Sequence, residues 1–232
     1  MSGFRAQLWR ASFLLLTFAS GCINIERSYP EKNFFVLEIG RDEKVPPSHQ
    51  TVNGILEVSE LRISPRYHAQ GFIYRISEAS YESDFYNQFL IAPAALITEE
   101  LRKGLAQSRI FAHVINASSQ LRPTHRLEGI VNALYGDFRD SGAGRAVMEI
   151  EFLLTRQLPP GTEIIMAKRY SKSVALSRRS PDALVKSWDE ALEEILTSLI
   201  ADLDSANRQR ETSSPTPPGG RDRDKSGGEE SR

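Results

Sequence analysis

Three long β-prone stretches follow one another in the second half of this chain, and they constrain its fold more than any other feature. They cover residues 126–138, 145–158 and 163–176, and turn-forming segments at 140–144 and 159–161 separate them. The middle stretch alternates apolar and polar residues, which is the period of a strand with one buried face. Its predicted core-facing residues are Ala146, Met148, Ile150, Phe152 and Leu154. Because the connections are short and rich in Gly, Pro and Ser, we expect antiparallel hairpins.

Shorter strand-like segments occupy much of the first half. They cover residues 34–39, 54–64, 71–77, 81–86 and 111–115. Pro65 is predicted to end the second of them, because proline cannot continue a hydrogen-bonded ladder. Segments 71–77 and 81–86 are predicted to pair as a hairpin.

Two segments have the period of amphipathic helices instead. Residues 93–107 place Ile97, Leu101 and Leu105 on one face, and Pro93 suits the first turn. Ser180, Pro181 and Asp182 form a second helix start, with a hydroxyl cap and an acid in the first turn. The apolar stripe of that helix comprises Leu184, Trp188, Leu192, Ile195, Leu199 and Leu203; Lys186, Asp189, Glu190, Glu193 and Glu194 are expected on its solvent side. We therefore predict an α+β fold: a two-layer sandwich of a mostly antiparallel sheet with two amphipathic helices packed on it.

The N-terminus resembles a bacterial lipoprotein signal. Arg5 and Arg10 precede a short apolar run, which is followed by Ser20, Gly21 and the single cysteine, Cys22. A basic region, an apolar stretch too short to span a bilayer and a small-residue cleavage site are typical of secretory signals. In lipoproteins the cysteine after the cleavage site is acylated, so Cys22 is the predicted lipid-attachment residue. Acylation with palmitate-like chains holds a protein stably on a membrane when two or more chains are present.

This signal sets the expected organisation of the chain. Residues 1–21 are predicted to be the signal peptide, 22–33 a lipidated tether, 34–206 the folded α+β domain and 207–232 a disordered tail. The tail assignment depends on composition, since residues 207–232 contain no large apolar side chain that could offset the entropy of ordering. Ile23 and Asn24 follow the cysteine, and neither is the Asp that retains enteric lipoproteins in the inner membrane. We therefore expect the protein on the periplasmic side of the outer membrane.

Composition and motifs argue against nucleic-acid binding and against an enzyme. The chain has 29 basic and 30 acidic residues, so no global field attracts nucleic acid. The histidines, His49, His68, His113 and His125, lack metal-ligand spacing. No nucleophile elbow occurs, and Gly142-Ala143-Gly144 lacks the residues of a phosphate-binding loop. We expect no catalytic residues, no metal and no cofactor.

Aromatic residues concentrate just before the first helix. Tyr81, Phe85, Tyr86 and Phe89 lie within nine residues that carry few charges. Such a cluster is a candidate surface for a protein partner or for lipid. The same residues could equally belong to the core, and the sequence leaves both interpretations open.

Two blocks around this cluster resemble the ABC-type transport auxiliary lipoprotein family, also called PqiC-like. The first runs from Tyr81 to Arg102, and the second places Leu105, Ser108 and Phe111 in a Leu-x-x-Ser-x-x-Phe pattern. An early Phe34-Phe35-Val36-Leu37 strand after the cysteine also matches. The resemblance covers roughly residues 22–204. Many members have Arg-Trp where this chain has Tyr86-Asn87, so no role of that Trp is transferred.

The resemblance implies a role beside a transporter. Members accompany ABC systems with a membrane-anchored MCE-domain protein, which move phospholipids or other hydrophobic molecules between the inner and outer membranes. The expected partners are thus the MCE protein, its ABC permease and ATPase, and the membrane; homo-oligomer formation is left open. The alternatives are a scaffold for outer-membrane assembly or lipopolysaccharide binding, and an envelope hydrolase.

Overall fold

The computed structural model describes residues 31–40 and 51–213. The predicted signal peptide, Cys22 and most of the predicted tether lie outside the described residues. Residues 41–50 and 214–232 also lie outside them. Within the described part of the chain, no helix combines the length and apolarity needed to cross a membrane.

The three long β stretches form the predicted antiparallel meander. They are β7 (His125–Asp137), β8 (Arg145–Leu158) and β9 (Gly161–Ala175). In β8, the alternating residues Ala146, Met148, Ile150, Phe152 and Leu154 are all fully buried. On its other face Glu149 and Glu151 form ion pairs with Arg169 of β9, at 3.6 and 2.8 Å. The alternation thus predicted correctly which face of β8 meets the core.

The other edge of β7 pairs with three short strands placed one after another along its length. They are β2 (Val52–Val58), β3 (Arg62–Ile63) and β4 (Gly71–Arg75), and all three run parallel to β7. Beyond them lie β6 (Phe111–Asn116), parallel to β2, β5 (Tyr81–Phe89), antiparallel to β4, and β1 (Asn33–Phe35), parallel to β5. The α+β class is confirmed, but the sheet is mixed. The expectation of a mostly antiparallel sheet holds for the three long strands and for the β4–β5 hairpin, whereas the other pairings of the short strands are parallel.

The predicted strand 54–64 is divided into β2 and β3. The chain leaves the ladder between them because Leu61 is buried and donates its backbone N–H to Oγ1 of Thr98, at 3.0 Å. A one-turn helix, η2 (Pro65–Tyr67), follows β3. The sequence analysis predicted one continuous strand here, whereas the chain bends between Val58 and Arg62.

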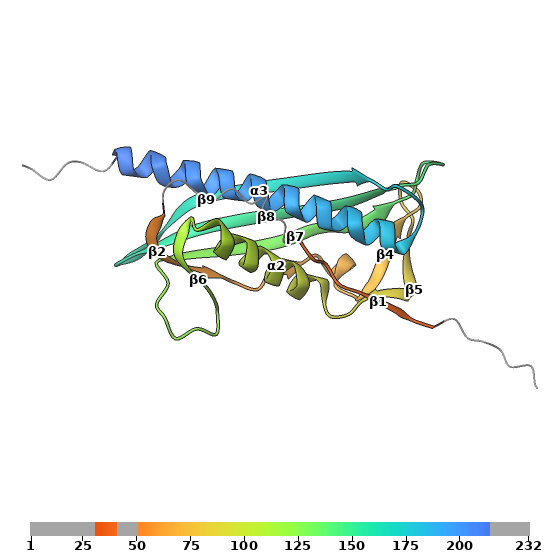
Figure 1. The fold of residues 1–232 in the computed structure, drawn as a ribbon, viewed down its shortest axis with the longest axis horizontal. Helices are drawn as coiled ribbons and strands as arrows, with labels where there is room; N and C mark the ends of the chain where they lie inside the picture. The colour runs from red at the N-terminus through yellow and green to blue at the C-terminus, as the bar shows by residue number, and fades with distance from the viewer. Residues whose placement is uncertain (1–30, 41–50, 214–232) are drawn as a thin grey trace, which may run out of the picture. The chain divides into compact units, whose positions relative to one another are not determined.

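Two helices cover the core face of the sheet (Figure 1). They are α2 (Pro93–Ser108), which contacts β6 and α3, and α3 (Pro181–Ser213), which lies along β8 and β9. Ser180 Oγ accepts a hydrogen bond from the N–H of Ala183 at 3.2 Å, so the predicted cap forms. The whole predicted stripe of α3, from Leu184 to Leu203, is buried.

Helix α3 continues past residue 206, where the sequence analysis ends the domain. It reaches Ser213, and an ion pair of 2.9 Å joins Arg208 to Asp204 one turn earlier. Extending an existing helix requires only one more residue to be ordered per hydrogen bond, so a polar sequence can continue it.

An aromatic cluster fills the core beneath β1, β4 and β5. The Trp188 ring lies 5.1 Å from Phe72 and 5.5 Å from Phe89, and Phe35 lies 5.1 Å from Phe72, between ring centres. Phe35 of β1 and Phe89 of β5 are paired in register. Because side chains alternate along a strand, Phe34 must point to the outer side of the sheet.

Candidate functional site

The four predicted partner-binding aromatics do not form one cluster. Phe89 is buried in the core, so it is not available to a partner. Tyr81 is half-buried, and its ring lies 5.8 Å from Tyr135. Phe85 and Tyr86 are exposed by 64% and 41%, with their rings in edge contact at 5.3 Å. The candidate surface therefore keeps Phe85 and Tyr86, while Tyr81 belongs to a separate cluster.

Phe85 and Tyr86 lie on a large bulge in β5. The β4–β5 ladder pairs Gly71 with Gln88 and Ile73 with Ser83, so five steps along β5 oppose two along β4. A Cβ atom at Gly71 would lie 2.6 Å from the carbonyl oxygen of Asp84. Glycine at this position therefore permits the close approach of the bulge to β4.

Asp84 holds the bulge together with four hydrogen bonds. Its Oδ1 accepts from the backbone N–H groups of Tyr86 and Asn87 at 2.8 and 3.0 Å. Its Oδ2 accepts from the Tyr74 hydroxyl and from Asn87 Nδ2, both at 2.7 Å. The backbone that carries the two exposed rings is thus fixed before any partner arrives.

The electrostatics of this network favour an ionised Asp84. Burial alone would raise the pKa of Asp84, but the hydrogen bonds from Asn87 and Tyr74 outweigh it and hold that pKa below its ordinary value. The pKa of Tyr74 is raised, first by burial and then by its bond to Asp84. Asp84 is therefore an acceptor whose oxygens are already engaged, which suits a structural role better than proton transfer.

Strand β1 extends this exposed surface. Lys32 Nζ lies 4.2 Å above the centre of the Phe85 ring, and Asn33 Nδ2 donates to Asn87 Oδ1 at 3.2 Å. The N–H of Leu90 donates to the carbonyl of Phe35 at 2.8 Å. Six exposed apolar residues lie on β1 and β5 or within two residues after these strands, and we call them the β1–β5 apolar edge: Phe34, Val36, Phe85, Tyr86, Leu90 and Ile91.

Sequence reasoning missed four of these six residues. One signal for Phe34 and Val36 was present, because Phe34-Phe35-Val36-Leu37 is apolar at every position. A strand that is apolar on both faces usually has both faces covered. Phe35 and Leu37 face the core, so Phe34 and Val36 form a second apolar face that the domain leaves exposed.

A shallow depression adjoins the bulge and shares Asp84 with it. Its volume is about 280 Å³, and its lining includes Tyr74, Asp84, Phe138, Arg179 and Leu184. The Arg179 guanidinium lies 4.6 Å from the centre of the Phe138 ring. Its lining contains no His or Cys.

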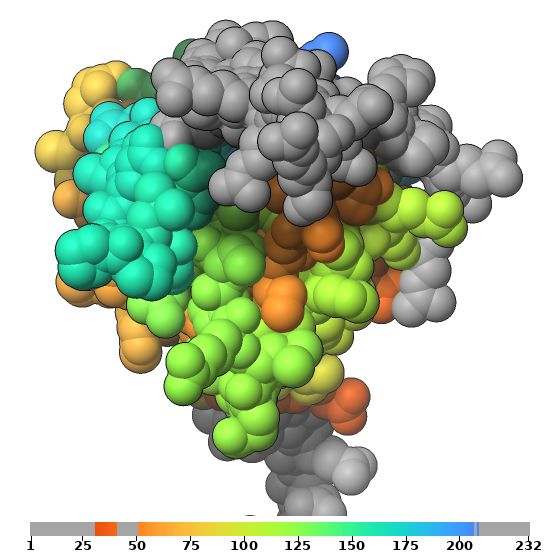
Figure 2. Space-filling view, turned by 90° about the vertical axis from the view of Figure 1, so that its left-hand side faces the viewer, coloured from red at the N-terminus to blue at the C-terminus, as the bar shows by residue number. Residues whose placement is uncertain are grey.

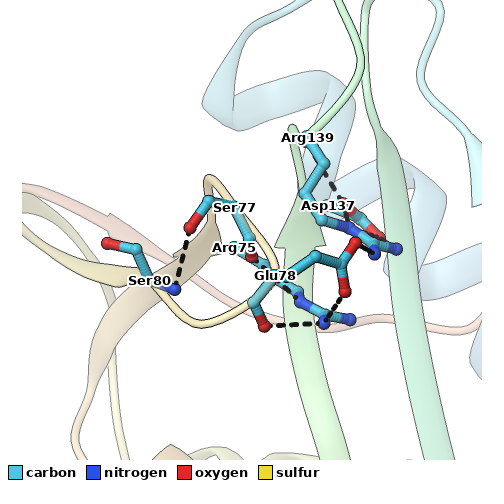
Figure 3. Close-up of polar contacts among 6 residues, drawn as sticks. All are labelled: Arg75, Ser77, Glu78, Ser80, Asp137 and Arg139. Carbon is cyan, nitrogen blue, oxygen red and sulfur yellow. Dashed lines mark hydrogen bonds and ion pairs between the residues drawn. The ribbon is translucent and has the colours of Figure 1, made fainter.

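The turn between β4 and β5 carries a separate ion-pair cluster (Figure 3). Glu78 lies between Arg75, at 3.1 Å, and Arg139, which also pairs with Asp137 at 2.7 Å. The hydrogen bond from Arg139 lowers the pKa of Asp137, and the opposing effect of burial is smaller. These ion pairs connect the turn to the end of β7. Glu78 is exposed to solvent, and its contacts in the cluster are with the two arginines.

The described residues contain no group of three or more His, Cys, Asp or Glu side chains arranged to hold a metal ion. His49 and Cys22 lie outside them. Chemically, the β1–β5 apolar edge offers aromatic and aliphatic surface beside Lys32, which suits contact with apolar groups.

Comparison with known proteins adds information on the fold. No protein-family model matches the chain, and no curated protein matches its sequence. Among solved structures, the fold is similar to that of protein XCC0632 from Xanthomonas campestris, of family DUF330, with a TM-score of 0.63 and 12% identity over 78% of this chain and 98% of that one. A crystal structure of a protein described as uncharacterized matches with a TM-score of 0.58 and 16% identity, over 75% of this chain and 99% of that one. The chain therefore shares its α+β fold with these two proteins along nearly their whole length.

Proposed function

We propose that this protein is a lipoprotein of the bacterial cell envelope that acts, without catalysis, as an auxiliary component of an ABC/MCE-type transport system. The transported molecules would be phospholipids or other hydrophobic compounds moving between the inner and outer membranes. The sequence resemblance to the PqiC-like family motivates this proposal, and an α+β domain with an exposed apolar edge is compatible with it.

One observation carries the proposal: the β1–β5 apolar edge lies where the described chain begins. Lys32, Asn33 and Phe34 contact or pair with β5, and the chain before them leads to Cys22. An acylated Cys22 would place this edge on the membrane side of the domain. The absence of Asp after Cys22 favours the periplasmic face of the outer membrane, with an MCE-domain protein and its permease and ATPase as partners.

A binding role also fits the chemistry of the edge better than an enzymatic one. Asp84 is the carboxylate nearest the exposed rings in sequence, and four hydrogen bonds engage it. A general base needs a free acceptor aimed at a substrate proton, which Asp84 does not offer.

Co-purification tests the transport role directly. The whole operon is expressed, membranes are solubilised in mild detergent, and this protein is captured through a C-terminal tag. The MCE-domain protein is expected in the eluate in stoichiometric amount. An unrelated outer-membrane lipoprotein with the same tag is the control for co-extraction. Recovery of this protein at full yield without the MCE protein would contradict the proposal.

A further inference from the structure

We propose that the β1–β5 apolar edge rests directly on the lipid surface beside the acylated cysteine, with Phe85 and Tyr86 in the headgroup region. The inference rests on the proposed function in one respect, since it requires Cys22 to be acylated. It goes further because it assigns this surface to lipid and not to a protein partner, and it fixes which end of the domain faces the membrane.

Exposed apolar surface is concentrated at this edge. Among the described residues, ten large hydrophobic side chains are exposed, and six of them form the edge. Leu158 and Ile164 flank the β8–β9 turn instead. That turn and β1 lie at opposite ends of the domain in Figure 1, and Figure 2 shows the end at which the β8–β9 turn protrudes. Clustering of exposed apolar residues on a single surface marks an interaction site more strongly than the same residues scattered.

The geometry of the bulge suits insertion into an interface. Asp84 holds the backbone of Tyr86 and Asn87, so the two rings project from a fixed frame and lose little freedom on binding. Tyrosine and phenylalanine at a membrane interface bury their rings, and a tyrosine hydroxyl stays at headgroup level. Lys32 lies over the Phe85 ring, where its ammonium group can meet headgroup phosphates while its stem covers apolar surface.

The length of chain outside the structure limits where this edge can go. Asn33, the first residue of β1, lies eleven positions after Cys22, and an extended chain of that length spans at most about 40 Å. With Cys22 acylated, the start of β1 would stay within that distance of the bilayer. The edge includes Phe34 of β1. The tether therefore limits how far this edge can lie from the bilayer.

Charge favours an apolar contact over an electrostatic one. Lys32 is the cation at the Phe85 ring, and Asp182 of α3 lies across a neighbouring depression that Lys32 and Phe34 also line. A surface of mixed charge gains little from anionic lipids, whereas apolar burial is insensitive to screening. Contact with lipid should therefore persist at high salt.

Depth-dependent quenching tests the proposal on the full mature protein. Phe85→Trp and, as a matched control, Ile164→Trp are reconstituted into phosphatidylethanolamine/phosphatidylglycerol vesicles whose acyl chains carry bromine. Phe85 and Ile164 are exposed by 64% and 63%, so the two positions start equally solvated. The mature chain retains Trp188, which is fully buried and contributes the same background to both. Tyr86→Trp repeats the test in case Phe85→Trp disturbs the bulge.

The expected result is a blue shift and at least a twofold loss of the added fluorescence at position 85, in low and high salt, with neither change at position 164. A blue shift without bromine quenching would mean that protein covers the edge, either a second copy or a partner, and would overturn the proposal. Equal quenching at both positions would also overturn it.

Mass spectrometry and flotation separate this failure from failure of the proposed function. If Cys22 carries acyl chains and the protein floats with vesicles, but position 85 is not quenched, only the lipid contact is wrong. If Cys22 is unmodified and the protein does not float, both proposals fall.

Discussion

The hydroxyl of Tyr74 donates a hydrogen bond of 2.7 Å to Oδ2 of Asp84, and this bond joins β4 to the bulge of β5. Both residues lie on one hairpin, yet the bond spans the point where its ladder is interrupted. A break in a ladder leaves backbone groups without strand partners, and Asp84 replaces part of what is lost by accepting from two backbone N–H groups. The exposed rings of Phe85 and Tyr86 therefore depend on one carboxylate for their position.

Replacing Asp84 by Ala should loosen the bulge without unfolding the domain. Hydrogen bonds to a charged group contribute more than neutral ones, so we expect the free energy of unfolding to fall by about 2–3 kcal/mol. Hydrogen exchange at the amides of Tyr86 and Asn87 should accelerate. Tyr74→Phe removes a single bond and should cost about 1 kcal/mol. Unchanged exchange at both amides in Asp84→Ala would show that the carboxylate does not hold the bulge.

Asp189 should make the domain less stable as pH rises. The sequence placed it on the solvent side of α3, but it is half-buried, and its Oδ1 accepts the N–H of Glu38 at 3.0 Å. Burial, with the nearby charges of Glu100 and Glu38, raises its pKa from 3.8 to about 7. Because the pKa of Asp189 is higher in the folded state than in the unfolded state, the folded state binds the proton more tightly. The stabilisation is therefore complete below pH 4 and is lost as pH rises to about 7.

Asp189→Asn keeps an acceptor for Glu38 and removes the charge. In urea unfolding, the variant should be more stable than the wild type by roughly 1–2 kcal/mol at pH 8 and no more stable at pH 4. Glu190→Asn, one position along on the exposed side of α3, is the control and should not change the pH slope. An equal pH slope in wild type and Asp189→Asn would refute the assignment.

Gly104 should resist substitution although it lies within a helix. Alanine has the better helix propensity by about 1 kcal/mol, yet a Cβ at this position would collide with the Leu196 side chain of α3, which is fully buried. We expect Gly104→Ala to lower the free energy of unfolding by about 1–3 kcal/mol, measured by chemical denaturation. The double variant with Leu196→Ala should be more stable than the sum of the single effects predicts. Additive losses would mean that α2 and α3 are not in close contact here.

Cys22→Ala should remove the membrane anchor. Without a thiol to acylate, the protein is expected to be released from membranes or to remain unprocessed, because stable anchoring needs at least two acyl chains. Fractionation of cells grown with radiolabelled palmitate provides the measurement. Label that still enters the alanine variant would rule out Cys22 as the attachment site.

Local pattern was sufficient for most of the elements. Pro93 starts α2, Ser180 caps α3, and the alternation in β8 identified its buried face. These features depend on residues a few positions apart, so a periodic sequence and a few capping residues specify them. The α+β class followed, since long alternating strands with one apolar face require amphipathic helices to cover them.

Pairing between distant segments was needed for the rest. Whether β2, β3 and β4 run parallel to β7, and which ring of the Tyr81–Phe89 cluster enters the core, depends on contacts across many residues of chain. Phe89 packs against Trp188 in the core, whereas Phe85 is exposed and lies beneath Lys32. No local period in the sequence distinguishes these two phenylalanines, because both lie on the same strand. Burial is a property of the assembled sheet, and so the position of the apolar edge followed from tertiary packing.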